Sequence, residues 1–331
     1  MANYLVTGVA GFIASRVTEM LLDDGHTVVG VDNMNNAYDV KMKEYRLRRL
    51  LGRTGFTFDL LDIAEWQAVE GWAAGRRQSS NFPSFHAIIN LAARAGVRQS
   101  VDNPWVYVST NMTGTLNLLE VCRRYAIPKF ILASTSSIYG NNAPLPTPET
   151  ADSNYPLQSY AASKKGAEAM CHAYHFLYGI DVTIVRYFTV YGPAGRPDMS
   201  MFRFTKWISE GYPVIVNGDG EQSRGFTYLD DIARGTILAV KPSGYEIINL
   251  GGHELIKINS LIGMLEQVIG RKAEIVRGPA NQYEMLANWA DVEKAGRLLG
   301  WTPQVSIKEG VTKLVEWYNA ERAWTSQIIT D

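Results

Sequence analysis

The first half of the chain alternates short apolar runs with longer amphipathic stretches. The apolar runs are hydrophobic at odd and even positions alike, which is the pattern of parallel strands buried between two layers of helices. Six runs have this character: Tyr4–Val6, Val28–Val31, Phe56–Phe58, Ala87–Leu91, Phe130–Ala133 and Val182–Val185. Right-handed crossovers between such strands build an α/β fold with a doubly wound parallel (Rossmann) sheet.

The rhythm changes near Tyr191, where loops rich in Gly, Pro and Asp begin. Weaker strands and further helical patterns follow at Val214–Val216, Glu246–Leu250, Ser260–Ile269 and Ile307–Asn319. We expect a smaller C-terminal, substrate-binding lobe there, with a chain that can cross between the lobes more than once. The expected division is 1–188 plus about 227–257 for the sheet domain, and 189–226 with 258–331 for the second lobe.

Composition and charge exclude several classes of protein. The 331 residues are 46% hydrophobic and 20% charged, which argues against disorder. Lys plus Arg is 32 and Asp plus Glu is 33, so the net charge is −1 and the overall basic field of a nucleic-acid binder is missing. We interpret one basic run as the solvated face of a helix: Lys41, Lys43, Arg46, Arg48, Arg49 and Arg53.

Two further observations bear on the compartment. No apolar run approaches the roughly 20 residues of a membrane span. The two cysteines, Cys122 and Cys171, are too few for a disulfide framework and suit a reducing compartment. We therefore expect a cytoplasmic enzyme without nucleic-acid or membrane partners, whose cysteines are small buried side chains.

A glycine-containing turn follows the first strand and precedes a helical pattern. Gly8 and Gly11 lie in the stretch Thr7-Gly8-Val9-Ala10-Gly11-Phe12-Ile13-Ala14. Glycines at this place let backbone N–H groups and the helix dipole approach a pyrophosphate. The GxxGxxA spacing differs from the common GxGxxG, so a plain tight turn is the alternative interpretation.

Acidic residues after the second and third strands extend this site. Asp32 stands 18 residues after Ala14, where a carboxylate accepts a hydrogen bond from the adenosine ribose 2′-hydroxyl. The neighbouring Asn33 is uncharged and no arginine is placed to receive a 2′-phosphate, which favours NAD over NADP. The third strand ends at Asp59 and Leu60, which we expect at the adenine edge.

Acid–base chemistry is indicated by Tyr160 and Lys164, which lie one turn apart at the start of a helical pattern. Tyrosine, with a pKa near 10, is a poor base at neutral pH, but a lysine ammonium and a charged nicotinamide ring would lower that pKa. The fifth strand ends in Ser134-Thr135-Ser136-Ser137, at the sheet edge where ligands bind. Together these features predict proton abstraction from a hydroxyl coupled to hydride transfer to NAD. The Tyr–Lys spacing alone also fits an exposed helix pair.

These motifs together resemble the extended short-chain dehydrogenase/reductase family. The matching stretches are Thr7-Gly8-x-x-Gly11-Phe12-Ile13, Asn90-Leu91-Ala92-Ala93, Ser134-Thr135-Ser136-Ser137-Ile138-Tyr139-Gly140, Tyr160-x-x-x-Lys164 and Leu299-Gly300-Trp301-Thr302-Pro303. Within the family, the chain is most similar to NAD-dependent nucleotide-sugar epimerases, with UDP-glucuronate 4-epimerases as the nearest subgroup. That narrower match rests on residues 32–39, 95–100 and 186–199.

The resemblance implies epimerisation at C4 of a UDP-hexuronic acid, UDP-glucuronate to UDP-galacturonate, through a transient 4-keto sugar with NAD regenerated in each cycle. Tyr160 takes the proton of the 4-hydroxyl, Thr135 hydrogen-bonds that oxygen, and Lys164 holds the nicotinamide ribose. The implied NAD contacts are Gly8, Gly11, Phe12, Ile13, Asp32, Asn33, Asp59, Leu60, Leu91, Ala92, Ala93, Asn111, Tyr160 and Lys164. The implied UDP-sugar contacts are Arg98, Thr135, Ser136, Ser137, Tyr160, Thr189, Arg196, Val214, Val216, Asn217, Arg224 and Arg277.

The acid group of such a sugar adds a chemical requirement. A C4 ketone beside a C5 carboxylate is a β-keto acid, which loses CO₂ unless the carboxylate is held. Arg196 can hold it with a bidentate guanidinium, assisted by the hydroxyls of Ser137 and Thr189. Related decarboxylases and dehydratases carry an acidic residue just after the catalytic threonine, where this chain has Ser136-Ser137.

Three alternatives remain open: an epimerase of neutral UDP-hexoses (UDP-glucose or UDP-N-acetylglucosamine), a UDP-glucuronate decarboxylase, and an NAD-binding protein without catalysis. The family also implies a homodimer formed by the helical patterns Trp105–Tyr125 and Tyr160–Tyr178, which could instead pack within one chain. No metal is implied, since the pair His172 and His175 lacks a third ligand.

Two positions depart from the family pattern. Tyr283-Glu284 stands where a Gly-Asp step is usual, which puts the local phosphate contacts in doubt. Asn90 replaces a more common histidine, a change that we expect to be tolerated.

Overall fold

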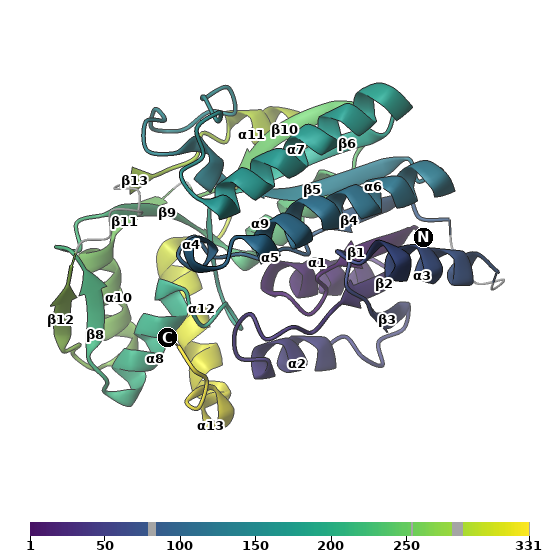
Figure 1. Ribbon diagram of the computed structural model, residues 1–331. Helices are drawn as coiled ribbons and strands as arrows, with labels where there is room; N and C mark the ends of the chain where they lie inside the picture. The colour runs from purple at the N-terminus through teal and green to yellow at the C-terminus, as the bar shows by residue number, and fades with distance from the viewer. Residues whose placement is uncertain (79–83, 253, 280–286, 331) are drawn as a thin grey trace.

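The largest feature of the computed structural model, which describes residues 1–78, 84–252, 254–279 and 287–330, is a seven-stranded parallel sheet (Figure 1). Its strand order is β10-β6-β5-β4-β1-β2-β3. The strands are β1 (Asn3–Thr7), β2 (Thr27–Asp32), β3 (Phe56–Leu60), β4 (Ala87–Asn90), β5 (Lys129–Thr135), β6 (Asp181–Tyr187) and β10 (Tyr245–Leu250). The six predicted strands are all present, so the predicted α/β doubly wound sheet is confirmed. A seventh strand, β10, extends the sheet beside β6.

The strands are apolar on both faces because helices cover both sides of the sheet. In β1, Val6 packs among residues of α1 (Phe12–Asp23), α9 (Leu229–Leu238) and α11 (Glu293–Leu299). The preceding residue, Leu5, packs among residues of α3 (Trp66–Gln78), α6 (Gly114–Tyr125) and α7 (Ser159–Tyr178). Successive side chains of a strand point to opposite faces, so each face of the sheet has its own core.

A second lobe lies at one end of the molecule (Figure 1). It contains a two-stranded sheet of β8 (Val214–Asn217) and β12 (Ile275–Gly278), and a second sheet in which β9 (Ser223–Tyr228) pairs with β7 (Thr189–Tyr191), β11 (Glu254–Lys257) and β13 (Ala287–Asn288). Its helices are α8 (Ser200–Glu210), α10 (Ile258–Ile269), α12 (Ile307–Ala320) and α13 (Arg322–Thr325). The second lobe has its own hydrophobic core, which includes Trp207, Leu261 and Leu314. The chain therefore leaves the large sheet after β6 and returns to it at β10.

The helical pattern at Trp105–Tyr125 is interrupted by a π-helical turn. A short α5 (Trp105–Tyr107) leads into the π turn η1 (Val108–Thr113), and α6 follows. Asn111 is buried in this turn, and its side-chain amide donates to the Arg94 carbonyl (3.0 Å) and to Ser163 Oγ on α7 (2.9 Å). The extra residue of a π turn thus places Asn111 against the helix that carries Tyr160.

Helix α2 (Lys41–Arg48) differs from the predicted solvated basic face. Lys41 and Arg48 are exposed, but Lys43 and Arg46 are buried. Lys43 Nζ donates to the Asp32 carboxylate at 3.2 Å, and Arg46 binds backbone carbonyls. The prediction was wrong for these two residues because a neutral overall charge does not reveal the partner that an individual cation meets.

Cys122 and Cys171 are free thiols buried in the core between the sheet and helices α6 and α7, as predicted. Among the helices within the described ranges, none combines the length and apolar character needed to cross a membrane.

Candidate active site

A continuous cavity of about 650 Å³ lies between the carboxyl edge of the large sheet and the second lobe. It is lined by the turn between β1 and α1, by the ends of β2, β4 and β5, by the start of α7, and by β8 and β9. Most of the predicted site residues line it: Gly8, Gly11, Phe12, Ile13, Asp32, Asn33, Leu91, Ala92, Ala93, Arg98, Thr135, Ser136, Ser137, Tyr160, Lys164, Thr189, Arg196, Val216, Asn217 and Arg224.

Asp59 and Leu60 do not line the cavity, so their prediction as adenine contacts is corrected. The Asp59 carboxylate accepts hydrogen bonds from Trp72 Nε1 and Arg76 Nε on α3, both at 2.8 Å, and Leu60 is 70% exposed. The chain turns into the cavity just beyond β3, where Asp62 accepts a hydrogen bond from Asn33 Nδ2 (2.8 Å) and lines the site. The end of the strand was predicted correctly, but the side chains that face the cavity come after it.

Three further predicted contacts lie outside the cavity lining. Asn111 is engaged with Arg94 and Ser163 behind the site. Val214 is fully buried in the core of the second lobe, and its neighbour Ile215 faces the cavity instead. Arg277 donates to Asn259 Oδ1 at the surface (3.0 Å). The departure at Tyr283-Glu284 lies outside the described residues.

Several lining residues were not predicted as contacts, among them Tyr38, Lys43, Asp62, Asp198 and Arg203. A signal for the buried face of α2 was present in the sequence. Met42, Lys43, Arg46 and Leu47 recur at helical spacing, so two cations share a face with two apolar residues. A Lys or Arg on an otherwise apolar helix face indicates a buried partner.

The glycine turn forms a close-fitting cradle. Gly8 has φ +69°, and a Cβ there would stand 2.8 Å from the backbone of Ala92. A Cβ on Gly11 would stand 2.7 Å from the Gly8 carbonyl oxygen. Gly11 is also the N-cap of α1 and provides no side-chain cap, so the first-turn N–H groups of α1 can meet an anion. This cradle fits the pyrophosphate of NAD.

The Asp32 carboxylate fits the adenosine ribose. It accepts hydrogen bonds from the Ala10 backbone N–H (3.1 Å), the Met34 backbone N–H (2.8 Å) and Lys43 Nζ (3.2 Å). An ionised carboxylate offers about four acceptor positions, so one more hydrogen bond can come from a ribose hydroxyl.

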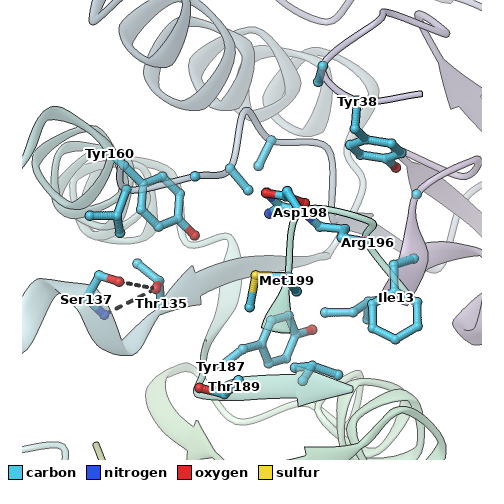
Figure 2. Close-up of a pocket in the computed structure, with 18 of the residues that line it drawn as sticks. Ile13, Tyr38, Thr135, Ser137, Tyr160, Tyr187, Thr189, Arg196, Asp198 and Met199 are labelled. Atoms are coloured by element: carbon cyan, nitrogen blue, oxygen red, sulfur yellow. Dashed lines mark hydrogen bonds and ion pairs between the residues drawn. The ribbon is translucent and has the colours of Figure 1, made fainter. Parts of the chain in front are cut away.

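Tyr160 and Thr135 lie near each other in the cavity (Figure 2), and Lys164, one helical turn after Tyr160, also lines it. Burial raises the pKa of Tyr160, while a hydrogen bond with Thr135 and the positive charge of Arg196 oppose this rise. Burial also lowers the pKa of Lys164 to about 8, against the negative charge of Glu168. The prediction that Lys164 and a charged nicotinamide ring lower the pKa of Tyr160 stays a prediction, and in this structure the positive charge that opposes the rise is that of Arg196.

A buried ion pair between Glu168 and Arg186 lies next to these active-site residues. Glu168 lies one turn beyond Lys164 on α7 and accepts hydrogen bonds from Arg186 Nε (3.0 Å) and Nη2 (2.7 Å). It also accepts a hydrogen bond from Ser134 Oγ (2.6 Å), next to Thr135. Both charged side chains are at most 3% exposed. The pair therefore joins the end of β5 to the helix that carries Tyr160 and Lys164.

Arg196 lies between Tyr160 and Tyr38 in the cavity (Figure 2). Its Nε donates to Asp198 Oδ1 (3.0 Å) and its Nη2 to Asp198 Oδ2 (2.5 Å). Ser137 also lines this part of the site, where its backbone N–H donates to Thr135 Oγ1 (3.2 Å). Hydroxyl groups and a guanidinium that is already paired with Asp198 thus stand near the tyrosine. A substrate with an anionic group would meet this guanidinium on the edge that Asp198 does not use.

No group of three or more His, Cys, Asp and Glu side chains is placed to hold a metal ion in the part of the chain that the structure describes. His172 and His175 both pack against the ring of Tyr245, with centroids 5.1 and 5.4 Å away. Asn90 is buried between strands, where it accepts from Thr7 Oγ1 (2.7 Å) and donates to Thr115 Oγ1 (3.1 Å).

Comparisons with known proteins agree with this geometry. Residues 4–251 match the NAD dependent epimerase/dehydratase family. The chain is 53% identical over 318 residues to the UDP-glucuronate 4-epimerase of Thermodesulfobacterium geofontis, with 96% of each chain covered. The structure is similar to that of UDP-glucuronic acid 4-epimerase from Bacillus cereus in complex with UDP-glucuronic acid and NAD, with a TM-score of 0.89, 34% identity, and 96% of this chain and 99% of that chain covered.

It is also similar to the structure of UDP-glucose 4-epimerase with UDP-glucose from Thermotoga maritima, with a TM-score of 0.88 and 32% identity over 97% of this chain and 99% of that chain. These matches confirm the resemblance drawn from the sequence motifs. They extend over almost the whole chain and include the cavity-lining segments. The chain belongs to the NAD dependent epimerase/dehydratase family.

Proposed function

We propose that this protein is a UDP-glucuronate 4-epimerase, which interconverts UDP-glucuronate and UDP-galacturonate through a transient 4-keto sugar. The observation that carries the proposal is the position of Arg196 in the cavity beside Tyr160 and Thr135. Such a site can hold a sugar carboxylate next to the residues that act on its 4-hydroxyl. The relatives from Thermodesulfobacterium geofontis and Bacillus cereus, which bear this activity in their names, support it.

The chemistry that NAD supplies when bound is the reversible removal of hydride from C4 of the sugar. In our proposal Tyr160 takes the proton of the 4-hydroxyl and returns it after the keto sugar has turned over in the site. Thr135 hydrogen-bonds the same oxygen, and its place near Tyr160 in the cavity (Figure 2) supports this role. Lys164 holds the nicotinamide ribose with its ammonium group, which requires that it stay protonated.

Retention of the carboxylate is the second task of the site. With a ketone at C4, the bond from C5 to the carboxylate breaks if it aligns with the carbonyl π system. Arg196, together with the hydroxyls of Ser137 and Thr189, holds the carboxylate away from that alignment. The absence of an acidic side chain directly after Thr135, where the sequence has Ser136-Ser137, fits an enzyme that keeps the acid group.

The two lobes bind different parts of the cofactor and substrate pair in this proposal. We propose that residues 1–188 with about 227–257 hold NAD and also supply the residues that act on the sugar, whereas 189–226 with 258–331 complete the UDP-sugar site. Helix α11 of the second range packs on the large sheet, and strand β11 of the first range pairs in the second lobe. The NAD contacts in this proposal are Gly8, Gly11, Phe12, Ile13, Asp32, Asn33, Leu91, Ala92, Ala93, Tyr160 and Lys164. The substrate contacts are Arg98, Thr135, Ser136, Ser137, Tyr160, Thr189, Arg196, Val216, Asn217 and Arg224.

The test is to incubate the purified protein with UDP-glucuronate, without added NAD, and to follow the sugar signals by NMR. Appearance of UDP-galacturonate supports both the reaction and a retained cofactor. Formation of a UDP-pentose and CO₂ would instead identify a decarboxylase. If nothing changes even after NAD is supplied, the proposed substrate is wrong.

A second candidate is epimerisation of a neutral UDP-hexose, because the UDP-glucose 4-epimerase of Thermotoga maritima has nearly the same fold similarity. Replacing Arg196 with alanine separates the two. An enzyme for the acidic sugar loses turnover of UDP-glucuronate, whereas an enzyme for neutral sugars keeps its activity on UDP-glucose.

We propose in addition that the protein forms a homodimer through α5 and α7. Trp105 on α5 and Phe176 on α7 are each 80% exposed, and Leu177 is 61% exposed. Large apolar side chains that are exposed on both of these helices favour a buried interface. Sedimentation velocity of the wild type and of the Phe176→Glu variant tests this, with a dimer expected only for the wild type.

We also propose a cytoplasmic location, which the free thiols of Cys122 and Cys171 support.

A further inference from the structure

Arg46 is a buried cation that joins three separate segments of the chain. Its side chain lies in the interior at 2% exposure. Nε donates to the Ala194 carbonyl (2.9 Å), and Nη2 donates to the Ala194 and Gly195 carbonyls (2.7 and 3.2 Å). Nη1 donates to the Ala10 carbonyl (3.3 Å) and to the Tyr38 hydroxyl (2.7 Å). These five hydrogen bonds equal the five N–H donors of a guanidinium.

The segments joined in this way are the two halves of the active site. Ala10 lies between Gly8 and Gly11 in the cofactor turn. Ala194 and Gly195 directly precede Arg196, the cation beside Tyr160. Arg46 therefore connects the turn that receives NAD to the loop that presents the carboxylate-binding arginine.

The loop at Ala194 needs such support. Ala194 has φ +55°, a left-handed conformation that residues with a Cβ rarely adopt. The next residue, Gly195, lies beside the ring of Phe12 at the start of α1, and a Cβ there would stand 3.1 Å from the Gly192 carbonyl oxygen and 3.7 Å from that ring. The Arg46 guanidinium itself lies over the Phe12 ring, 5.8 Å from its centroid. Strain and close packing both make the loop position sensitive to the groups that hold its carbonyls.

Asp198 does not replace this support. It pairs with Arg196 in a two-pronged contact, but both residues belong to the same short loop. A shift of the loop relative to α1 would move Asp198 and Arg196 together. The hydrogen bonds of Arg46 connect this loop directly to the backbone of the cofactor turn.

We propose that Arg46 is a positioning residue that sets Arg196 relative to the cofactor turn and so determines how firmly the sugar carboxylate is held while C4 is a ketone. This inference rests on the proposed epimerase function. Arg46 acts through Arg196 and touches neither the sugar nor the reacting atoms. A guanidinium suits the task because a lysine ammonium has only three donors and cannot span the same carbonyls.

A displaced Arg196 has a defined chemical consequence. In the normal cycle C4 of the sugar becomes a ketone, and its hydride would pass to the NAD held at the cofactor turn. If the carboxylate then rotates into alignment with the carbonyl, the C5–carboxylate bond breaks and CO₂ leaves. The electron pair forms the C4–C5 enolate, which takes a proton from water at C5 and becomes a UDP-4-keto-pentose. One NAD is left reduced for each CO₂ released. The ratio of UDP-4-keto-pentose to UDP-galacturonate therefore measures how firmly Arg196 holds the carboxylate.

The test compares the wild type with Arg46→Met, Arg46→Lys and the matched control Arg48→Met, which changes an exposed arginine of the same helix. Each protein is assayed with UDP-glucuronate and saturating NAD, and the ratio of UDP-4-keto-pentose to UDP-galacturonate is measured by NMR. Bound NAD is quantified after denaturation, and folding is checked by the melting temperature. These two measurements separate a shifted loop from lost cofactor or lost structure.

We expect Arg46→Met to raise the keto-pentose fraction by at least about tenfold, since small misplacements of a binding group cost up to a hundredfold in rate. Arg46→Lys should lie between this variant and the wild type, and Arg48→Met should match the wild type. If Arg46→Met does not fold, the same expectation is tested on Arg46→Lys.

Either of two results would overturn the role of Arg46. One is a folded variant with wild-type product ratio, and the other is a variant that loses NAD but keeps that ratio at saturating NAD. A wild-type protein that leaves UDP-glucuronate unchanged would refute the proposed function, and the role of Arg46 would be refuted with it.

Discussion

Replacing Glu168 with glutamine should reveal how far the buried ion pair sets the protonation of Lys164. Glutamine keeps the shape of the side chain and an oxygen for Ser134, so the change removes mainly the negative charge. That charge raises the pKa of Lys164, which burial lowers to about 8. Without it, the pKa of Lys164 must fall further, and the lysine loses its proton at a lower pH.

The size of the shift follows from simple electrostatics. The Cβ atoms of residues four apart on a helix lie about 6 Å from each other, and we take this distance as the separation of the two charges. At that distance and an effective dielectric constant of about 20, two unit charges interact by about 3 kcal/mol, which is about two pKa units. We therefore expect the pKa of Lys164 in the variant to lie clearly below its present value of about 8.

The variant should also be less stable, because Arg186 would remain as a buried cation without its counter-charge. Breaking a buried ion pair costs about 3–5 kcal/mol, which corresponds to a fall in Tm of roughly 5–15 °C for a chain of this size. The exposed pair of Glu309 and Lys313 provides a matched control, since Glu309→Gln should leave Tm nearly unchanged.

The assay is the pH dependence of kcat/KM at saturating NAD, together with Tm by calorimetry at neutral pH. In the wild type, activity should fall on the alkaline side near pH 8, where Lys164 loses its proton. In Glu168→Gln this alkaline limb should move to lower pH. An unchanged alkaline limb in a folded variant would refute the coupling between Glu168 and Lys164.

Three further changes test other parts of the site. Arg196→Ala should reduce kcat/KM for UDP-glucuronate by about a hundredfold or more, since a charged hydrogen bond contributes about 3 kcal/mol. NMR should also detect a UDP-4-keto-pentose. Epimerisation at the wild-type rate without this product would exclude Arg196 as the residue that holds the carboxylate. Gly11→Ala should lose bound NAD, because its Cβ would stand 2.7 Å from the Gly8 carbonyl oxygen, whereas Gly71→Ala, with open space around it, should keep the cofactor. Tyr160→Phe should keep bound NAD but lose at least about a thousandfold in kcat, as expected when the general base is missing. A turnover rate near that of the wild type would show that another residue is the base.

Much of the fold and of the site could be predicted from sequence because both rest on local patterns. The apolar runs of the central strands mark burial on both faces, and the spacing of Gly8, Gly11, Tyr160 and Lys164 reflects turns and helices formed by neighbouring residues. The predicted division assigned 227–257 to the sheet domain, but the place of β10 beside β6 at the sheet edge depends on the path of the chain through the second lobe, which no local pattern records.

The errors concern side chains whose surroundings come from distant segments. Asp59 and Leu60 were placed at the adenine because β3 ends there, but Arg76 and Trp72 on α3 draw the carboxylate away. Arg46 was interpreted as solvated, yet its partners Ala194 and Gly195 are about 150 residues away in the chain. In the same way, the influence of Arg196 on Tyr160 arises from tertiary packing and not from the helical spacing that suggested Lys164.

The most direct measurement is the reaction of the purified protein with UDP-glucuronate in D₂O without added NAD, followed by ¹H NMR. The expected product is UDP-galacturonate that carries hydrogen and not deuterium at C4, because the hydrogen removed from C4 stays within the site and returns to the opposite face. Deuterium at C4, or a UDP-pentose in place of UDP-galacturonate, would contradict an epimerase that works through a retained cofactor and a held carboxylate.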